Sequence, residues 1–329
     1  MYLIYKTRTL PKLIIAQHAL LKRLPPTHQK YEKIRTDLYN RKAGFGGERE
    51  FDYQLREFAP SYPHAVLHDL YLKQDQVYFQ IDSLLITPSV IVLFEIKNIA
   101  GKLQIKQNPT QFIRETATGE RTVLRSPIEE LERKKYFLGN WLKQRQIDVP
   151  LTDFVVFAYN NELIIENMAA HRIAFSYEMP NKLRALEMNT PILNEKQVQR
   201  LAYELTHAHR VFEPHPLIQK YKLSLEELEV GVTCHVCNRL TMKWRLRIWR
   251  CQACGYQDAV SHLNTLQEWY YIKGAQLTNR QFRQFSGIHS RHIAKRLLAN
   301  PYTELSGKNK TSIYQLAPQL LAMSTNLSF

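Results

Sequence analysis

Two acids and a lysine in neighbouring strand-like segments have the types and spacing needed for metal-dependent chemistry. The segment 90–97 is apolar until its last three residues, which place Glu95 and Lys97 two positions apart. Because successive strand residues point to opposite faces, Glu95 and Lys97 project from the same side of a sheet. Asp82 stands alone in the preceding apolar segment, and a tight turn at Pro88 would bring it level with Glu95. An acid buried there costs several kcal/mol unless it pairs with a cation or binds a metal.

This set of side chains suits phosphodiester hydrolysis. Asp82 and Glu95 would supply hard oxygen ligands for Mg²⁺ or Mn²⁺, joined by the carbonyl of Ile96. The metal would polarise the phosphate and lower the pKa of a bound water, while Lys97 would orient that water and offset charge in the transition state. A structural ion pair at a strand end is the alternative, and the pattern leaves the two interpretations equally open.

The four cysteines of the chain form two Cys-x-x-Cys pairs, Cys234 with Cys237 and Cys251 with Cys254. This spacing predicts a zinc ribbon in which four thiolates surround one Zn²⁺ ion. Because four protein ligands leave no position for water, the predicted zinc is structural. The alternative is two disulfides, which belong in an oxidising compartment that nothing in the sequence indicates.

The segment between the cysteine pairs alternates as a hairpin and is strongly basic. Its charged residues lie among Trp244 and Trp249, a mixture that suits phosphate contacts combined with stacking on bases or sugars. A spacer or protein-docking module is the alternative. The basic residues predicted to contact nucleic acid are Lys243, Arg245, Arg247 and Arg250.

A second basic motif follows the cysteines. Thr278 or Asn279 caps one predicted helix, Gly287 ends it, and Ser290 caps a second helix, as in a helix-turn-helix. A predicted hairpin comes next, with a basic tip resembling the wing of a winged helix; a plain helical pair on a basic surface is the alternative. The residues expected to contact DNA are Arg291, His292, Lys295 and Arg296 on the second helix, and Lys308 and Lys310 at the hairpin tip.

The elements that must position these residues alternate between strands and helices. Strand-like segments occupy 65–72, 77–87, 90–97, 102–105, 111–114, 151–159 and 172–176, and helical segments occupy 127–146 and 195–208. Ser126 and Pro127 suit the N-cap and first position of the longer helix. The glycines at 44, 46 and 47 are expected to separate a helix around 31–38 from a short one at 48–58. The pattern predicts an α/β domain with a mixed sheet.

Several of these motifs together resemble the nuclease-related domain (NERD) proteins, a branch of the PD-(D/E)xK nuclease superfamily. The resemblance covers about Gly46 to Trp141, and it implies a restriction-endonuclease-like core. It further implies that Asp82, Glu95 and Lys97 form the nuclease centre and that Glu48 is a helix carboxylate approaching it. The motifs that carry the resemblance are Gly46-Gly47-Glu48, His68-Asp69-Leu70, Gln80-Ile81-Asp82, Phe94-Glu95-Ile96-Lys97-Asn98 and Gly101.

One motif departs from the family pattern. Where the family often begins its long helix with Asn/Asp-Pro-x-x-Gln, this chain reads Ser126-Pro127-Ile128-Glu129-Glu130. A glutamine there can hold substrate or water, whereas Glu130 adds charge. Glu130 therefore either joins the metal site or weakens the activity. The combination with a zinc ribbon and a basic tail resembles a group of bacterial NERD proteins.

The positive charge of the chain lies at its two ends. The 329 residues carry a formal charge of +15, with ten Lys and Arg against two acids in residues 1–45 and 13 against three in residues 234–315. Such ends predict a polyanionic partner, nucleic acid first and an acidic membrane surface second. The zinc and helix-turn-helix patterns weaken the membrane alternative. Apolar runs far shorter than the roughly 20 residues of a membrane span predict a cytoplasmic protein.

The expected organisation is a basic helical hairpin at 1–45, a NERD nuclease-like domain at 46–210, a linker with a short helix at 211–230, a zinc ribbon at 231–258, a winged helix-turn-helix at 259–316 and a tail at 317–329. The sequence thus predicts a metal-dependent nuclease that acts on DNA. The alternatives are a catalytically inactive DNA-binding or scaffold protein of the same fold, and RNA in place of DNA. The sequence predicts no oligomeric state.

Overall fold

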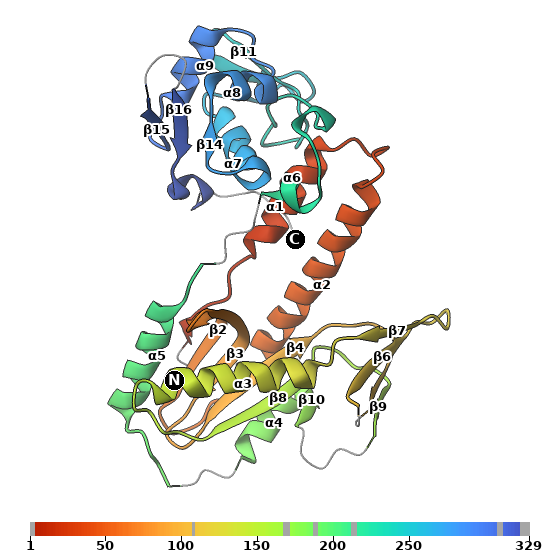
Figure 1. Ribbon diagram of the computed structural model, residues 1–329, viewed down its shortest axis with the longest axis vertical. Helices are drawn as coiled ribbons and strands as arrows, with labels where there is room; N and C mark the ends of the chain where they lie inside the picture. The colour runs from red at the N-terminus through yellow and green to blue at the C-terminus, as the bar shows by residue number, and fades with distance from the viewer. Residues whose placement is uncertain are drawn as a thin grey trace. The chain divides into compact units, whose positions relative to one another are not determined.

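The computed structural model describes residues 4–106, 109–166, 172–186, 190–211, 216–307 and 312–322 (Figure 1). The chain forms two compact units, each assembled from two separate stretches of sequence. Unit 1 comprises Met1–Thr9 and Lys42–Phe212, and unit 2 comprises Leu10–Arg41 and Glu213–Phe329. No helix in the described ranges is long and apolar enough to cross a membrane.

Unit 1 is built on a six-stranded mixed sheet with the order β1-β2-β3-β4-β8-β10. Strand β3 runs antiparallel to β2 and β4, whereas β1 is parallel to β2, and β8 is parallel to both β4 and β10. The predicted mixed-sheet α/β architecture is therefore confirmed. The strands are β1 (Ile4–Lys6), β2 (Ala65–Gln74), β3 (Val77–Ile86), β4 (Ile91–Lys97), β8 (Leu151–Phe157) and β10 (Ile173–Phe175).

A second, four-stranded sheet of unit 1 has the order β7-β6-β5-β9. Its strands are β5 (Lys102–Lys106), β6 (Gln111–Glu115), β7 (Arg121–Leu124) and β9 (Leu163–Ile165). Strands β1, β7 and β9 were missing from the prediction. Each has only three or four residues and no buried side chain, so it lacks the alternation of apolar and polar residues that marks a half-buried strand.

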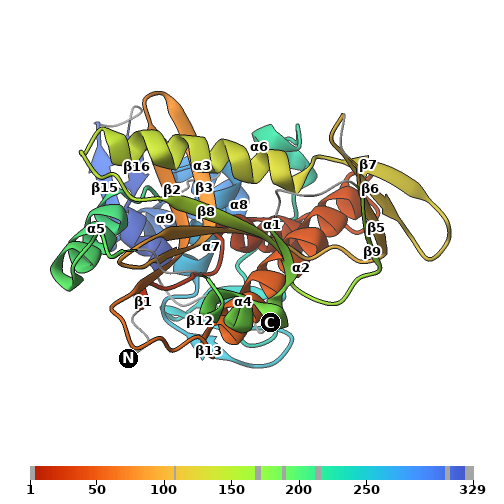
Figure 2. The ribbon, with the colours of Figure 1, turned by 90° about the horizontal axis from the view of Figure 1, so that it is seen from below.

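Helices cover both faces of the six-stranded sheet (Figure 2). Helices α3 (Pro127–Lys143) and α5 (Glu195–Ala208) pack on one face, where Leu138 and Leu201 join the core. Helix α4 (Met179–Arg184) and the last turns of α2 (Tyr31–Leu55) pack on the other face, where the ring of Phe51 contacts that of Phe94 of β4 at a tilt of 48°. The sheet is thereby buried on both sides, which explains why its central strands are almost wholly apolar.

The prediction that a new helix begins after the glycine cluster was wrong, because α2 continues from Tyr31 to Leu55 without a break. Glycine weakens a helix by about 1 kcal/mol, but tertiary packing can override that cost. At Gly47, an added Cβ would lie 2.5 Å from Cβ of Asn98 and 3.0 Å from Cβ of Ala158. Gly47 therefore allows the helix to approach the ends of β4 and β8 closely.

Unit 2 contains helices, a cysteine-bearing sheet of order β11-β12-β13 and a second sheet of order β14-β16-β15. One hydrophobic core joins the helices of this unit to strands of both sheets. The helices and strands are α1 (Lys12–Arg23), α6 (Leu217–Lys220), α7 (His262–Lys273), α8 (Asn279–Ser286), α9 (Arg291–Leu298), β11 (Met242–Arg245), β12 (Ile248–Cys251), β13 (Gln257–Asp258), β14 (Gln276–Leu277), β15 (Thr303–Ser306) and β16 (Ile313–Leu316).

A fully buried arginine of α1 lies within this core. Arg23 donates from Nε and Nη2 to Oε2 of Glu268 on α7, at 2.8 and 2.7 Å. It also donates to the carbonyl oxygens of Glu229, Phe285 and Gly231. Because a buried guanidinium needs such partners, this positive charge of the N-terminal segment serves the packing of unit 2.

The caps predicted for the two short helices of unit 2 are present. Thr278 and Gln281 form a capping box at the start of α8, and Gly287 ends α8 in the left-handed conformation with φ 73°. Ser290 accepts a hydrogen bond from the backbone N–H of Ile293 at the start of α9. Strands β15 and β16 then pair as the expected antiparallel hairpin.

Candidate functional site

The β3–β4 hairpin places Asp82 beside the end of β4. Ser83 lies opposite Phe94, which is the register expected from a tight turn around Pro88. The backbone N–H of Ile96 donates to Oδ2 of Asp82 at 2.9 Å. This bond crosses from β4 to β3 and fixes the orientation of the buried Asp82 carboxylate.

Glu95 and Lys97 project from the same side of β4, as their spacing predicts. Nζ of Lys97 lies 2.7 Å from Oε1 of Glu95 and 2.6 Å from Oε2 of Glu130 on α3. Lys97 is therefore held between two carboxylates. Glu130, the residue that departs from the family pattern, contacts the predicted centre through this lysine.

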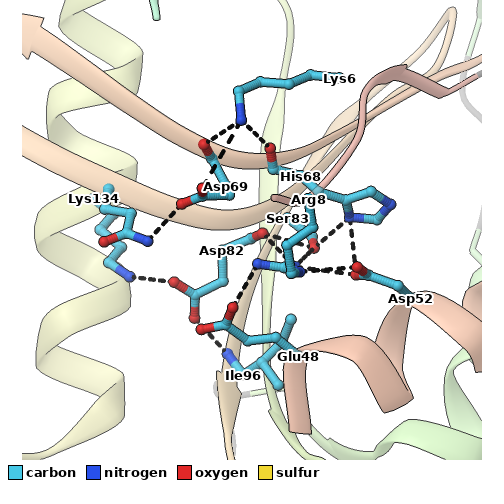
Figure 3. A network of polar contacts seen from close by, with 11 residues as sticks. Lys6, Arg8, Glu48, Asp52, His68, Asp69, Asp82, Ser83, Ile96 and Lys134 are labelled. Atoms are coloured by element: carbon cyan, nitrogen blue, oxygen red, sulfur yellow. Dashed lines mark hydrogen bonds and ion pairs between the residues drawn. The ribbon is translucent and has the colours of Figure 1, made fainter. Parts of the chain in front are cut away.

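A second lysine, which the sequence interpretation missed, lies between the two acids. Lys134 follows Glu130 by one turn of α3, and its Nζ lies 3.3 Å from Oδ1 of Asp82 (Figure 3). The same Nζ also pairs with Oε2 of Glu95. The signal was available, because residues four apart on a helix share a face. Glu130 pointing toward β4 implies that Lys134 does so as well.

Glu48 reaches the centre through an arginine that was also missed. Arg8 follows β1, and its Nη1 lies 2.7 Å from Oε2 of Glu48. Nε and Nη2 of Arg8 donate to the Asp52 carboxylate at 2.8 and 3.0 Å, and Nη2 also donates to the backbone carbonyl of Asp82 at 2.8 Å (Figure 3). Asp52 lies one turn after Glu48 on α2. Arg8 thus ties two carboxylates of α2 to the strand that carries Asp82.

An outer layer of contacts supports Arg8 and its partners. Nδ1 of His68 lies 3.0 Å from Oδ1 of Asp52 and 2.9 Å from Oγ of Ser83. Lys6 donates to the backbone carbonyls of His68 and Asp69, at 3.0 and 2.8 Å. Since Lys6 belongs to β1, these two bonds hold the edge strand to β2.

Burial and neighbouring charges raise the pKa values of Glu95 and Glu48 and lower that of Asp82. Burial, reinforced by the charge of Asp82, raises the pKa of Glu95 to about 7. Burial also raises the pKa of Glu48 to about 7, although Arg8 opposes it. For Asp82 burial acts in the same direction, but Lys134, the Ile96 N–H and Lys97 together hold its pKa below the ordinary value. Neighbouring acids whose pKa values are shifted apart in this way are typical of catalytic centres.

The donor set at the ends of β3 and β4 fits a divalent cation such as Mg²⁺ or Mn²⁺. Asp82 and Glu95 are only 8% and 3% exposed, and one oxygen of each already converges on a single cation, the Lys134 ammonium. Carboxylate oxygens are the ligands that these ions prefer, and Mg²⁺ commonly takes one or two of them and keeps several waters. The centre therefore offers two carboxylates, and the position of the Asp82 carboxylate is set by the Ile96 N–H.

Unit 2 contains the only group of three or more His, Cys, Asp or Glu side chains arranged as metal ligands in the described part of the chain. The sulfur atoms of Cys234, Cys237, Cys251 and Cys254 all lie within 4.8 Å of one another, and all four cysteines are free. The backbone N–H groups of Ala253 and Cys254 point at Sγ of Cys251, each at 3.4 Å. This four-thiol cluster could hold a metal such as zinc.

The hairpin between the cysteine pairs presents the predicted basic residues to solvent. Lys243, Arg245, Arg247 and Arg250 are all exposed. Trp249 is different, because it is 1% exposed and donates from Nε1 to Nδ1 of His262 at 3.3 Å. Stacking of Trp249 on a base is therefore excluded, whereas Trp244 is half-buried and lies under the guanidinium of Arg296.

Helix α9 turns its basic side chains outward. Arg291, His292, Lys295 and Arg296 are exposed, while Ala294, Leu297 and Leu298 are buried against unit 2. Lys308 and Lys310, predicted at the tip of the β15–β16 hairpin, lie outside the described residues. Helix α9 and the β11–β12 hairpin thus each carry a set of exposed cations.

The family comparison agrees with the geometry of unit 1. Residues 43–158 match the family model of the nuclease-related domain, so the chain contains a NERD domain. The matched range includes Glu48, Asp82, Glu95, Lys97, Glu130 and also Lys134. Arg8 and all of unit 2 lie outside it. No curated protein and no solved structure matches the chain.

Proposed function

We propose that unit 1 is a divalent-metal-dependent nuclease acting on DNA and that unit 2 binds the DNA. The observation that carries this proposal is the convergence of Asp82 and Glu95 on one cation, with Lys97 against Glu95, inside the range that matches the nuclease-related domain. A buried pair of acids with an adjacent lysine fits phosphodiester hydrolysis better than it fits a simple surface ion pair.

Each residue of the centre has a distinct role in this proposal. Asp82 and Glu95 hold Mg²⁺ or Mn²⁺, and the Ile96 N–H keeps the Asp82 carboxylate oriented. The cation, when bound, polarises the scissile phosphate and lowers the pKa of a water. Lys97 orients the attacking water and offsets negative charge in the transition state. Arg8 positions Glu48 beside the strand that carries Asp82.

Glu130 supports a second candidate function, a catalytically inactive DNA-binding or scaffold protein. Its carboxylate binds Nζ of Lys97 at 2.6 Å, in addition to the contact of Lys97 with Glu95 at 2.7 Å. A lysine held between two carboxylates is less available to a phosphate than one held by a single carboxylate. The neutral glutamine of the family pattern would leave Lys97 with one anionic partner fewer.

Unit 2 is proposed to grip DNA through two modules. A zinc ribbon at 231–258 is held by a structural Zn²⁺ on the four cysteines, and a winged helix-turn-helix occupies 259–316. Helix α9 would enter the major groove, and its exposed cations, with those of the β11–β12 hairpin, would contact phosphates. Such contacts release counterions, so binding should weaken steeply with salt.

Cleavage of plasmid DNA by the purified full chain, with Mg²⁺ or Mn²⁺, tests the nuclease. We expect nicking or linearisation that Asp82→Asn and Lys97→Met abolish. Lys135→Met is the matched control, because Lys135 is the next residue of α3 and pairs instead with Asp153 of β8, at 2.8 Å. Binding without cleavage under either metal supports the inactive alternative. Competition between DNA and RNA at fixed salt decides the substrate.

A further inference from the structure

The lysine between the two acids gives the centre a property beyond cleavage. We infer that Lys134 is a built-in counter-cation, whose ammonium group holds the position a divalent ion takes and must leave when that ion binds. The inference rests on the proposed function, because it concerns the same metal site. It makes metal binding a competition between an ion from solution and a side chain of the protein.

The geometry singles out Lys134 among the nearby cations. Its Nζ contacts Oδ1 of Asp82 and Oε2 of Glu95, so it bridges the two proposed metal ligands. Lys97 uses the other oxygen of Glu95, Oε1, and turns toward Glu130. Arg8 contacts Asp82 at the backbone carbonyl. Among these three cations, only Lys134 occupies oxygens of both acids.

Burial explains why the acids need this ammonium group. Asp82 and Glu95 are 8% and 3% exposed, and two neighbouring acids in such surroundings repel each other unless a cation lies between them. The side chain of Lys134 is itself only 13% exposed. Lys134 therefore keeps the metal-free centre folded and neutralised.

The same contacts imply that Lys134 and a divalent ion exclude each other. Lys134 contacts both carboxylates that would hold the ion, and two cations sharing one pair of carboxylates repel each other. Lys134 has a flexible four-carbon stem on a helix surface and can turn away without any movement of α3. One turn earlier, Glu130 offers a carboxylate at the favourable i,i+4 spacing.

The test compares the Mn²⁺ affinity of wild type with that of variants, each as the zinc-loaded full chain. The affinity is measured by titration calorimetry or by electron paramagnetic resonance of free Mn²⁺. Lys134→Met should bind Mn²⁺ about 10 to 100 times more tightly than wild type, which is the usual size of the coupling between two binding events in one protein. The control Lys135→Met should match wild type. Affinity of Lys134→Met equal to or below that of wild type overturns the inference.

Asp82→Asn separates failure of the inference from failure of the metal site. If wild type binds Mn²⁺ and Asp82→Asn does not, the metal site stands, and an unchanged affinity in Lys134→Met removes only the competition. If none of the chains binds Mn²⁺, both the metal site and the inference fall.

A second measurement uses wild type alone and does not depend on the folding of a variant. Acylation of lysines by an activated ester, followed by mass spectrometry, reports how free each ammonium group is. Mn²⁺ should increase the labelling of Lys134 several-fold and leave Lys135 unchanged. Equal labelling of Lys134 with and without bound Mn²⁺ contradicts displacement.

Discussion

Replacing Arg8 by methionine should destabilise unit 1 and leave unit 2 unaffected. Arg8 lies outside the matched NERD range, yet its guanidinium makes five hydrogen bonds to the centre. Two go to the Asp52 carboxylate, one to Glu48, one to the Asp82 carbonyl and one to Oγ of Ser83. Methionine keeps much of the length of the side chain but removes its charge and all of its donors.

The expected cost follows from the partners that the substitution leaves behind. Removing one member of a buried ion pair typically costs 3–5 kcal/mol, because the other charge stays unpaired. The side chains of Glu48 and Asp52 are 23% and 16% exposed, so water recovers part of that cost. We therefore expect the free energy of unfolding of unit 1 to fall by about 3 kcal/mol. The free energy of unfolding of Arg8→Lys should lie between those of wild type and Arg8→Met, because lysine keeps the charge but cannot form the bidentate contact with Asp52.

Hydrogen exchange of the full chain, measured by mass spectrometry at increasing urea, resolves the two units separately. Peptides from β2 and β3 report unit 1, and peptides from α7, held by the Arg23–Glu268 pair, are the internal control. In Arg8→Met the opening free energy should fall in β2 and β3 and stay constant in α7. A fall of less than about 1 kcal/mol in β3 would refute the assignment of Arg8 as the residue that holds α2 to this sheet.

Three further predictions concern unit 2. Elemental analysis should find one zinc per chain, and chelation should unfold the segment that carries the four cysteines. A zinc content near zero would contradict the proposed zinc ribbon. Reversing Arg291 and Lys295 to Glu should weaken duplex DNA binding at least about 100-fold and lower the slope of binding affinity against salt concentration by about 2. The same change at exposed Lys222 and Lys273 should have little effect. Equal losses of affinity in the two double variants would exclude α9 as the contact helix. Burial lowers the pKa of His262 to about 4, so the unfolded chain takes up its proton first as the pH falls below about 6.5. In zinc-saturated wild type, the free energy of unfolding of unit 2 should therefore fall by about 2 kcal/mol between pH 7 and 5, and an equal fall in His262→Gln would contradict this source.

The central strands and the predicted acids could be read from the sequence because short-range rules govern them. The turn around Pro88 sets the β3–β4 register, and that register brings Asp82 to the level of Glu95. The period of two along β4 places Lys97 on the same side as Glu95. The helix caps at Thr278 and Ser290 are equally local.

What the sequence did not reveal depends on contacts between distant segments. Arg8 lies 74 residues before Asp82, and nothing in its neighbourhood announces an ion-pair network. The glycines of α2 read as a helix break, yet Gly47 is needed for close packing against Asn98. Lys134 is an intermediate case, since its spacing from Glu130 was visible but the direction of Glu130 was not.

The proposed function depends on DNA cleavage at the centre formed by Asp82, Glu95 and Lys97. Its most direct test is the single-turnover cleavage rate at saturating protein and Mn²⁺, where differences in DNA binding no longer matter, for wild type and Asp82→Asn. We expect a rate at least about 100-fold lower in Asp82→Asn, with the rate of Lys135→Met unchanged. Equal rates in wild type and Asp82→Asn, or no cleavage by wild type, would contradict the proposed function.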